Sequence, residues 1–210
     1  MIGRIIESDA DVAEGADWLA AREPRFAAAL KQTGPLPLRR RPDGFAELLS
    51  AIVSQQVSTA SAAAIWGRMQ AAGLAEADRV TSASEDALRA VGLSRQKIRY
   101  ARTLARAGID YGTLRAMPDD EVIATLVAVP GVGRWTAEIY VMFSLGRADV
   151  LAAGDLALQE AARDLFDLTA RPREAALRSM ADEWSPWRGV AARLLWAYYR
   201  VMTKKEGIRA

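Results

Sequence analysis

Hydrophobic residues recur along most of this chain every three to four positions, the spacing that places them on one face of an α-helix. Segments with the two-residue alternation of a β-strand are scarce, and alanine, the strongest helix former, is abundant. The pattern therefore predicts an all-α protein. Helices are expected at residues 9–22, 24–31, 43–53, 58–70, 84–90, 94–107, 120–127, 134–144, 156–166, 171–183 and 186–205.

The ends of several predicted helices are marked by residues that commonly cap helices. Asp43 and Asp119 are expected N-caps, and Ser185 followed by Pro186 should open the last helix. A segment rich in proline and arginine, residues 34–42, interrupts the helical pattern and is the expected boundary between two parts of the chain. Its three arginines could contact phosphates, or they could belong to a solvated basic loop.

The composition limits the chemistry that the protein can perform. The chain has 210 residues, of which 51% are hydrophobic, and it contains neither cysteine nor histidine. Disulfides, cysteine-ligated zinc, iron–sulfur clusters and catalytic triads that need histidine or cysteine are therefore excluded. Acid–base chemistry would fall to Asp, Glu, Lys or Tyr. The net charge of +2 gives only weak support for a nucleic-acid partner.

The sequence was also read for signal peptides and membrane spans, which would indicate where the protein is located. The first residues lack the apolar core of a signal peptide, and no apolar run approaches the roughly 20 residues of a membrane span. We therefore expect a cytoplasmic protein with no membrane partner. The absence of cysteine is compatible with that compartment but does not require it.

The most informative stretch is a short turn, residues 129–133 with the sequence VPGVG, between two of the expected helices. Pro130 ends the first helix, while Gly131 and Gly133 can adopt positive φ and have no Cβ to hold a ligand away. The first turn of the second helix offers unpaired N–H groups and the positive end of its dipole. These parts make an anion site, for which phosphate is the expected occupant. An ordinary helix–helix turn is the alternative, because Gly-x-Gly spacing alone has low specificity.

Two further features carry charge. Asp155 follows a loop of small residues and stands at the start of the helix expected at residues 156–166, where a carboxylate caps N–H groups and is favoured by the dipole. Asp155 is thus either a simple N-cap or a catalytic carboxylate, and the two roles can coexist. A basic stripe, which could follow a phosphate backbone or form a solvated helix face, consists of Arg95, Arg99, Arg102 and Arg106.

Residues 126–137, LVAVPGVGRWTA, resemble the helix-hairpin-helix motif of DNA glycosylases related to endonuclease III. That motif reads Leu-x-x-Val/Ile-Pro-Gly-Val/Ile-Gly-x-x-Thr-Ala, and the matching residues are Leu126, Val129, Pro130, Gly131, Val132, Gly133, Thr136 and Ala137. The resemblance extends over roughly residues 43–199 and includes a small-residue loop before an aspartate. It implies two helical lobes with a cleft between them. Residues 43–150 would form one lobe with the hairpin, and residues 1–42 and 151–210 the other.

The resemblance also implies roles for individual residues. Asp155 would be the catalytic carboxylate. DNA would be bound by the hairpin and its surroundings, namely by Gln56, Gly131, Gly133, Arg134 and Thr136. A monovalent cation could be held by the backbone carbonyls of Val127, Val129 and Val132. No cofactor would be required, and the four-cysteine cluster of some relatives cannot form here.

One position distinguishes the branches of this family. Glycosylases that are also lyases carry a lysine two residues after the second hairpin glycine, as a Schiff-base nucleophile. This chain has Trp135 there, and the downstream LLWAYY contains Trp196. Both features resemble the alkylpurine branch, the 3-methyladenine-DNA glycosylases II. The base pocket would then include Trp135, Trp196 and Gln55.

The implied function is hydrolysis, in base excision repair, of the N-glycosidic bond of alkylated purines such as 3-methyladenine and 7-methylguanine. The implied partner is double-stranded DNA containing a damaged base, which must be flipped out of the helix, and the protein would act as a monomer. Two other classes stay open. A non-catalytic helix-hairpin-helix DNA-binding module would not need Asp155. An all-α protein-interaction domain with a fortuitous Gly-x-Gly turn would not bind DNA.

Overall fold

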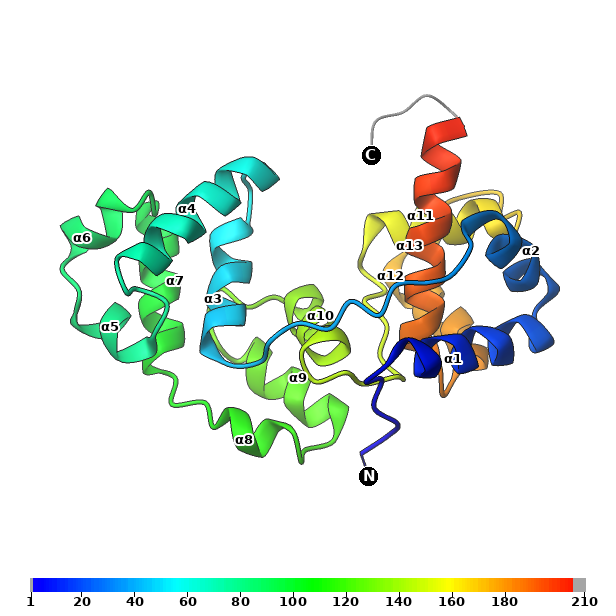
Figure 1. Cartoon of the computed structure of the whole chain (residues 1–210), viewed down its shortest axis with the longest axis horizontal. Helices are drawn as coiled ribbons and strands as arrows, with labels where there is room; N and C mark the ends of the chain where they lie inside the picture. Colours follow the sequence, from blue (N-terminus) through cyan, green and yellow to red (C-terminus); the bar gives the residue numbers. More distant parts are fainter. Residues whose placement is uncertain (1, 206–210) are drawn as a thin grey trace. The chain divides into compact units, whose positions relative to one another are not determined.

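The computed structural model describes residues 2–205, and the regular structure of these residues is helical (Figure 1). Ile5 and Arg147 form an isolated antiparallel bridge, and the described residues contain no β-strand. None of the described helices is long and apolar enough to cross a membrane. The helices are α1 (Asp9–Arg22), α2 (Pro24–Thr33), α3 (Phe45–Ser54), α4 (Thr59–Ala71), α5 (Ala77–Ser82), α6 (Glu85–Ala90), α7 (Arg95–Arg106), α8 (Tyr111–Leu114), α9 (Asp119–Val127), α10 (Arg134–Phe143), α11 (Leu156–Leu165), α12 (Glu174–Met180), the 3₁₀ helix η1 (Ala181–Trp184) and α13 (Arg188–Lys205).

The prediction of an all-α fold is confirmed, and each predicted helix has a counterpart in the structure. The helix expected at residues 171–183 is formed by α12 followed directly by η1. The short helices α5 and α8, of six and four residues, were not predicted. α6 is as short as α5, but it begins after the capping residue Ser84, whereas α5 has no side-chain cap. Residues 34–42 contain no helix, as expected from their proline content.

Two of the predicted N-caps are wrong. The cap position of α3 is occupied by Gly44, and the carboxylate of Asp43 instead accepts hydrogen bonds of 2.6 and 2.9 Å from Arg115. Asp119 is the first residue of α9 rather than its cap, because Pro118, with φ of −57° and ψ of 148°, already takes the extended cap conformation. A carboxylate inside the first turn still interacts favourably with the helix dipole.

The start of the last helix also differs from the prediction. Ser185 and Pro186 lie before α13, which begins at Arg188. The Ser185 hydroxyl donates to a carboxylate oxygen of Asp149 at 2.8 Å, and the same carboxylate accepts from the Arg188 side chain. Ser185 therefore links two loops through Asp149 instead of capping the helix.

The chain divides into two compact units. Unit 1 comprises the residues up to Arg40 together with those from Val141 onward, and unit 2 comprises residues 41–140. The expected boundary at residue 150 differs from this division, which falls within α10. Backbone hydrogen bonds explain the difference, because the N-terminal segment binds residues just after α10. The Ile6 N–H donates to Gly146 and the Ala148 N–H donates to Arg4.

Unit 2 is built around α7, which packs against α3, α5 and α6, while α3 also packs against α4 (Figure 1). The buried face of α7 consists of Ile98, Ala101 and Leu104. Ser94 caps this helix by accepting a hydrogen bond from the Lys97 N–H. The apolar residues of α7 therefore face the core of unit 2, and its arginines occupy other faces.

Unit 1 is organised around α13, which packs against α1, α2 and α11 (Figure 1). Gly15 allows a close approach, because a Cβ built there would lie 2.6 Å from the ring of Trp187. Phe26, Phe166 and Trp184 pack together with ring centroids 5.3 to 5.8 Å apart.

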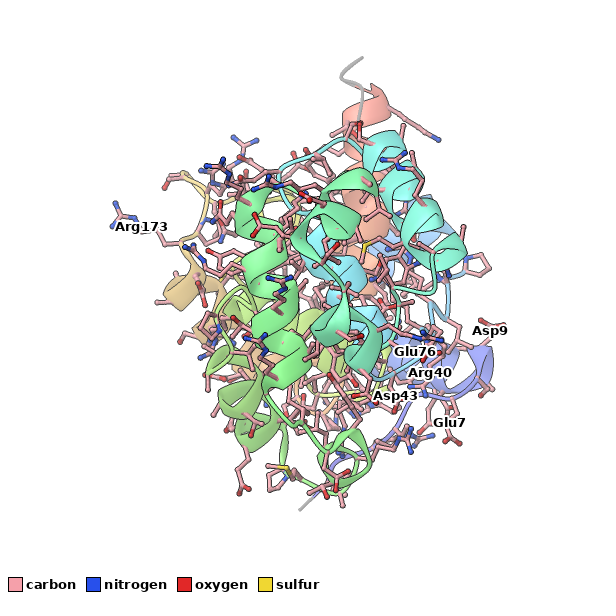
Figure 2. The ribbon with its side chains drawn as sticks, turned by 90° about the vertical axis from the view of Figure 1, so that its left-hand side faces the viewer. Glu7, Asp9, Arg40, Asp43, Glu76 and Arg173 are labelled. Atoms are coloured by element: carbon pink, nitrogen blue, oxygen red, sulfur yellow. The ribbon has the colours of Figure 1, made fainter. Side chains whose placement is uncertain are left out.

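Exposed charged side chains such as that of Arg173 extend away from the ribbon (Figure 2).

Candidate functional site

The hairpin, residues 129–133, connects α9 to α10 within unit 2. A hydrogen bond of 3.0 Å from the Val132 N–H to the Val129 carbonyl closes it. Gly131 has a φ of +102°, and a Cβ built on it would lie 2.6 Å from Cγ of Tyr100. A Cβ built on Gly133 meets no atom within 4 Å among the described residues. Gly131 is therefore required by the fold of the hairpin, whereas Gly133 leaves open space in front of the backbone.

The first turn of α10 follows the hairpin directly. The first turn of a helix supplies N–H groups that its own carbonyls do not satisfy, and it carries the positive end of the helix dipole. Trp135 is 46% exposed in this turn, whereas Thr136 is buried. Arg134 donates to Glu138 at 3.0 Å one turn later, and Glu138 is 1% exposed. Because Arg134 neutralises a buried carboxylate, we expect the backbone N–H groups to provide most of the anion-binding capacity here.

The turn that follows α3, residues 55–57, is attached to the hairpin. The side-chain amide of Gln55 donates to the Gly131 carbonyl at 2.9 Å. Gln56 has a φ of +57°, a left-handed conformation that residues other than glycine seldom adopt. Lys97 donates to the Val53 carbonyl at 2.6 Å, at the end of α3, and burial lowers the pKa of Lys97. The turn and the hairpin therefore form one connected element of unit 2.

Replacement of Gln55 with Ala is expected to lower the free energy of unfolding by about 1–2 kcal/mol, because the Gly131 carbonyl loses its side-chain donor. Urea denaturation would measure this change. Gln56→Ala is the matched control, since the Gln56 side chain makes no hydrogen bond in the described structure, and it should change stability by less than about 0.5 kcal/mol. Equal losses for the two variants would contradict the role assigned to Gln55.

Asp155 is the N-cap of α11 in unit 1, as the sequence predicted. Its Oδ1 atom accepts hydrogen bonds from the N–H groups of Ala157 at 2.9 Å and Leu158 at 3.1 Å. The same atom accepts a hydrogen bond of 3.2 Å from the indole nitrogen of Trp196. Asp155 is only partly buried. The carboxylate is therefore held in one orientation by three donors and still reaches the surface.

Trp196 belongs to a stack of planar side chains in unit 1. Its ring lies 5.8 Å from that of Phe143, tilted by 33°, and the guanidinium of Arg193 lies 4.8 Å from the Phe143 ring. Arg193 is 1% exposed and donates to the carbonyls of Gly189 and Leu38. Burial, together with two neighbouring arginines, lowers the pKa of Arg193 to about 10. The stack fixes the plane of Trp196 and with it the direction of its N–H group.

The structure thus brings the predicted site residues together in two groups. In unit 1, Asp155 and Trp196 are in direct contact. In unit 2, the hairpin, the first turn of α10 and the two glutamines of the turn after α3 form the second group. Gln55 was predicted to line a base pocket; its amide nitrogen is bonded to the hairpin, and the pocket role stays a prediction. Trp135 belongs to the second group and is exposed.

Sequence reasoning missed several residues that support these groups. Tyr100 packs against Gly131, Lys97 binds the end of α3, and Phe143 stacks on Trp196. Lys97 and Tyr100 are three residues apart on α7, which places them on one face of that helix. The helical spacing was visible in the sequence, but their partners lie in distant segments that no local pattern identifies.

The chain is similar to known proteins in sequence and in fold. Residues 49–186 match the family of HhH-GPD superfamily base excision DNA repair proteins. The alkylbase DNA glycosidase-like protein mag2 of Schizosaccharomyces pombe is 25% identical, over 96% of this chain and 100% of the relative. The crystal structure of a DNA-3-methyladenine glycosidase from Bacillus halodurans is 32% identical, with a TM-score of 0.81, over 100% of this chain and 97% of that chain.

A second solved structure is similar to this chain. It is that of the S. pombe 3-methyladenine DNA glycosylase Mag1 in complex with abasic DNA, which is 27% identical with a TM-score of 0.76. The similarity covers 87% of this chain and 95% of that one. The family match includes the hairpin, α10 and Asp155, and it ends before Trp196. The chain therefore belongs to the HhH-GPD superfamily of base excision DNA repair proteins.

Proposed function

We propose that this protein is a monofunctional DNA glycosylase that hydrolyses the N-glycosidic bond of alkylated purines in double-stranded DNA. The observation that carries the proposal is the fixed carboxylate of Asp155, which is bound by two backbone N–H groups and by Trp196. Support comes from the family membership of the chain and from relatives named as 3-methyladenine DNA glycosylases.

DNA binding is assigned to the hairpin and to the first turn of α10. The backbone N–H groups near Gly131 and Gly133 would hold a phosphate, and the dipole of α10 would favour its negative charge. Gln56 is the assigned contact from the turn after α3, and Arg134 and Thr136 would support the same region. Because the main contacts are to phosphate, DNA affinity should fall as salt is added.

The chemistry assigned to Asp155 follows from the nature of the leaving group. A purine alkylated at N3 or N7 is positively charged, so it departs without protonation by a general acid. What the enzyme must supply is stabilisation of an oxocarbenium-like sugar and direction of a water molecule to C1′. One ionised carboxylate can do both, by electrostatic attraction and by general-base assistance. The absence of histidine from the chain is consistent with a reaction that needs one carboxylate and no general acid.

Base selection is assigned to aromatic side chains. A cationic purine stacked on tryptophan gains roughly 0.5–2 kcal/mol from the cation–π interaction. Trp196, beside Asp155, is the first candidate, and exposed Trp135 is the second. An apolar surface discriminates weakly by binding alone, so selection would also rest on the weaker glycosidic bond of the damaged nucleotide.

The reaction needs no cofactor, and a monovalent cation is an optional addition at the hairpin. The carbonyls of Val127, Val129 and Val132 are the proposed ligands. Val127 ends α9, where helix carbonyls carry partial negative charge, and neutral carbonyl oxygens suit such a cation. The ion would reinforce the hairpin and the phosphate bound to it.

The proposal is tested with a duplex that contains a single 7-methylguanine. A monofunctional glycosylase should leave an intact strand that breaks only after alkali treatment, and borohydride should trap no covalent complex, because Trp135 replaces the lysine that a lyase uses. Strand breakage without alkali, together with borohydride trapping, would contradict the monofunctional assignment.

Trp196→Phe separates two roles of this tryptophan. The variant keeps an aromatic ring beside Phe143 but loses the N–H donor to Asp155. We expect the single-turnover rate to fall by about 5- to 15-fold, which corresponds to one hydrogen bond of about 1–1.5 kcal/mol, with little change in affinity for abasic DNA. Trp196→Ala should lose the stacking as well and fall further. A wild-type rate for Trp196→Phe would show that the N–H group does not position Asp155.

A non-catalytic DNA-binding module is the second candidate function. The capping geometry of Asp155 is compatible with it, because two N–H groups of α11 bind the carboxylate whether or not it takes part in a reaction. Such a module would bind DNA through the hairpin and release no base. The alkali-dependent strand breakage described above therefore separates the two functions.

A further inference from the structure

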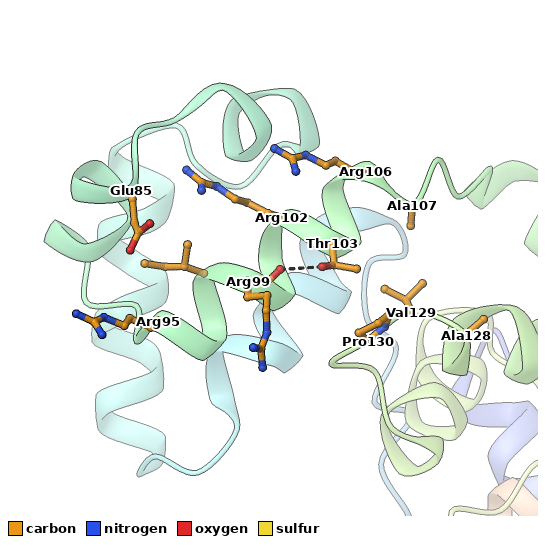
Figure 3. Close-up of a pocket in the computed structure, with 11 residues that line it drawn as sticks. Glu85, Arg95, Arg99, Arg102, Thr103, Arg106, Ala107, Ala128, Val129 and Pro130 are labelled. Atoms are coloured by element: carbon orange, nitrogen blue, oxygen red, sulfur yellow. Dashed lines mark hydrogen bonds between the residues drawn. The ribbon is translucent and has the colours of Figure 1, made fainter.

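A groove of about 530 Å³ lies on the surface of unit 2, next to the hairpin. One wall is α7, which contributes arginines from successive helical turns, and Val129 and Pro130 of the hairpin lie at its other side (Figure 3). We call it the arginine groove. Its basic residues are Arg95, Arg99, Arg102 and Arg106.

The charge of this groove is concentrated and unbalanced. α7 contains five basic residues and no acidic residue, although the whole chain has a net charge of only +2. None of the four groove arginines forms an ion pair in the described part of the chain. Glu85 is the one acidic residue among the groove's lining residues, and it is paired with Arg89. The groove therefore presents a positive surface that an anion can neutralise.

The spacing of the arginines brings like charges together. Residues three and four apart on a helix are neighbours, and pairs of like charge at this spacing destabilise it. Arg102 donates a hydrogen bond of 2.9 Å to the Ala83 carbonyl, which favours one orientation of its side chain beside the other arginines. A polyanion that binds along α7 would relieve this repulsion.

The groove adjoins the predicted phosphate site, because Val129 and Pro130 of the hairpin line it. Tyr100 packs against Gly131 of the hairpin, and the guanidinium of Arg99 lies 5.4 Å from the Tyr100 ring. The stripe from Arg95 to Arg106 extends about 16 Å along the helix axis. One strand of DNA carries a phosphate about every 3.4 Å along its axis, so the stripe is long enough to meet several.

We propose that the arginine groove binds the phosphodiester backbone of DNA beyond the phosphate held by the hairpin. This inference rests on DNA being the substrate in the proposed function, but not on the hydrolysis. Guanidinium groups suit this role because they are always charged and can bind phosphate oxygens with two hydrogen bonds. Contacts to phosphate carry no sequence information, so the groove adds affinity for damaged and undamaged DNA alike.

The test compares Arg95→Gln/Arg99→Gln with the control Arg25→Gln/Arg79→Gln, which removes the same charge from exposed arginines outside the groove. Affinities are measured by fluorescence anisotropy for labelled duplexes of roughly one and two helical turns that contain an abasic-site analogue. We expect the groove variant to bind the longer duplex about tenfold more weakly. Its slope of log affinity against log salt should be shallower by about 2.

Three further readouts make the result decisive. Helix content of the groove variant should match the wild type, and its unfolding midpoint should be equal or slightly higher, because two neighbouring like charges are removed. The control variant should bind DNA like the wild type. Base release at saturating enzyme should be unchanged, since the groove does not touch the reacting atoms.

An unchanged salt slope, or an equal loss in the control, would overturn the proposal and leave the groove available to an acidic protein partner. If the wild type binds DNA through the groove but releases no base, the proposed function fails and the groove assignment stands.

Discussion

Replacement of Asp155 with Asn should reduce the single-turnover rate of base release by roughly 10²- to 10⁴-fold, the usual contribution of a general base. The expected loss is this large because the chain contains no histidine to replace the carboxylate. Affinity for abasic DNA should remain close to that of the wild type, because binding is assigned to the hairpin. Rapid-quench measurement with enzyme in excess over a damaged duplex isolates the chemical step.

Asn is the informative substitution because it preserves the structural role of Asp155. Asn and Asp are about equally good N-caps, so the bonds from Ala157 and Leu158 can persist. Glu174→Gln is the matched control, since the Glu174 carboxylate lies 3.3 Å from a Cβ built on Gly154, next to Asp155 in sequence. Glu174→Gln should retain the rate of base release. A large loss in that control, or full activity in Asp155→Asn, would place the catalytic carboxylate elsewhere.

The second large effect is expected from Gly133→Ala, which should weaken DNA binding by about 10- to 100-fold. That range corresponds to the loss of one charge-assisted hydrogen bond of about 1.5–3 kcal/mol to phosphate. No described atom lies within 4 Å of a Cβ at this position, so the methyl group would point into the space that the phosphate is proposed to occupy. Stability should fall by less than about 1 kcal/mol, the cost of Ala at a helix N-cap.

Gly131→Ala provides the contrast, because this glycine is required by the fold itself. Its φ is +102°, and the new methyl group would collide with Tyr100. We expect the free energy of unfolding to fall by about 1–3 kcal/mol, measured by urea denaturation. If Gly133→Ala were as destabilising as Gly131→Ala, or bound DNA normally, the phosphate site would not lie where we assign it.

The helices of this protein could be predicted because their signals are local. Serine residues that accept a hydrogen bond from the first turn precede α4, α6 and α7, and each also stands before an apolar pattern in the sequence. The capping errors had a local cause as well. Asp43 and Asp119 are good cap residues, but the cap positions are taken by Gly44 and Pro118, whose backbone conformations are not helical.

The candidate site could be predicted only in part. The hairpin and the cap position of Asp155 are encoded in continuous segments, so sequence patterns revealed both. The bond between Trp196 and Asp155 joins residues 41 positions apart, and the bond between Gln55 and Gly131 joins residues 76 apart. Such contacts arise from tertiary packing, which no periodicity specifies. The sequence therefore did not reveal that the amide nitrogen of Gln55 supports the hairpin.

The most direct test of the central claim is to identify the bases that the wild-type protein releases from methylated duplex DNA. Mass spectrometry of the small-molecule fraction should detect free 3-methyladenine or 7-methylguanine, whereas unmethylated DNA of the same sequence should yield neither above background. Failure to release any alkylated base from methylated DNA that the protein binds would contradict the glycosylase assignment and support a binding module.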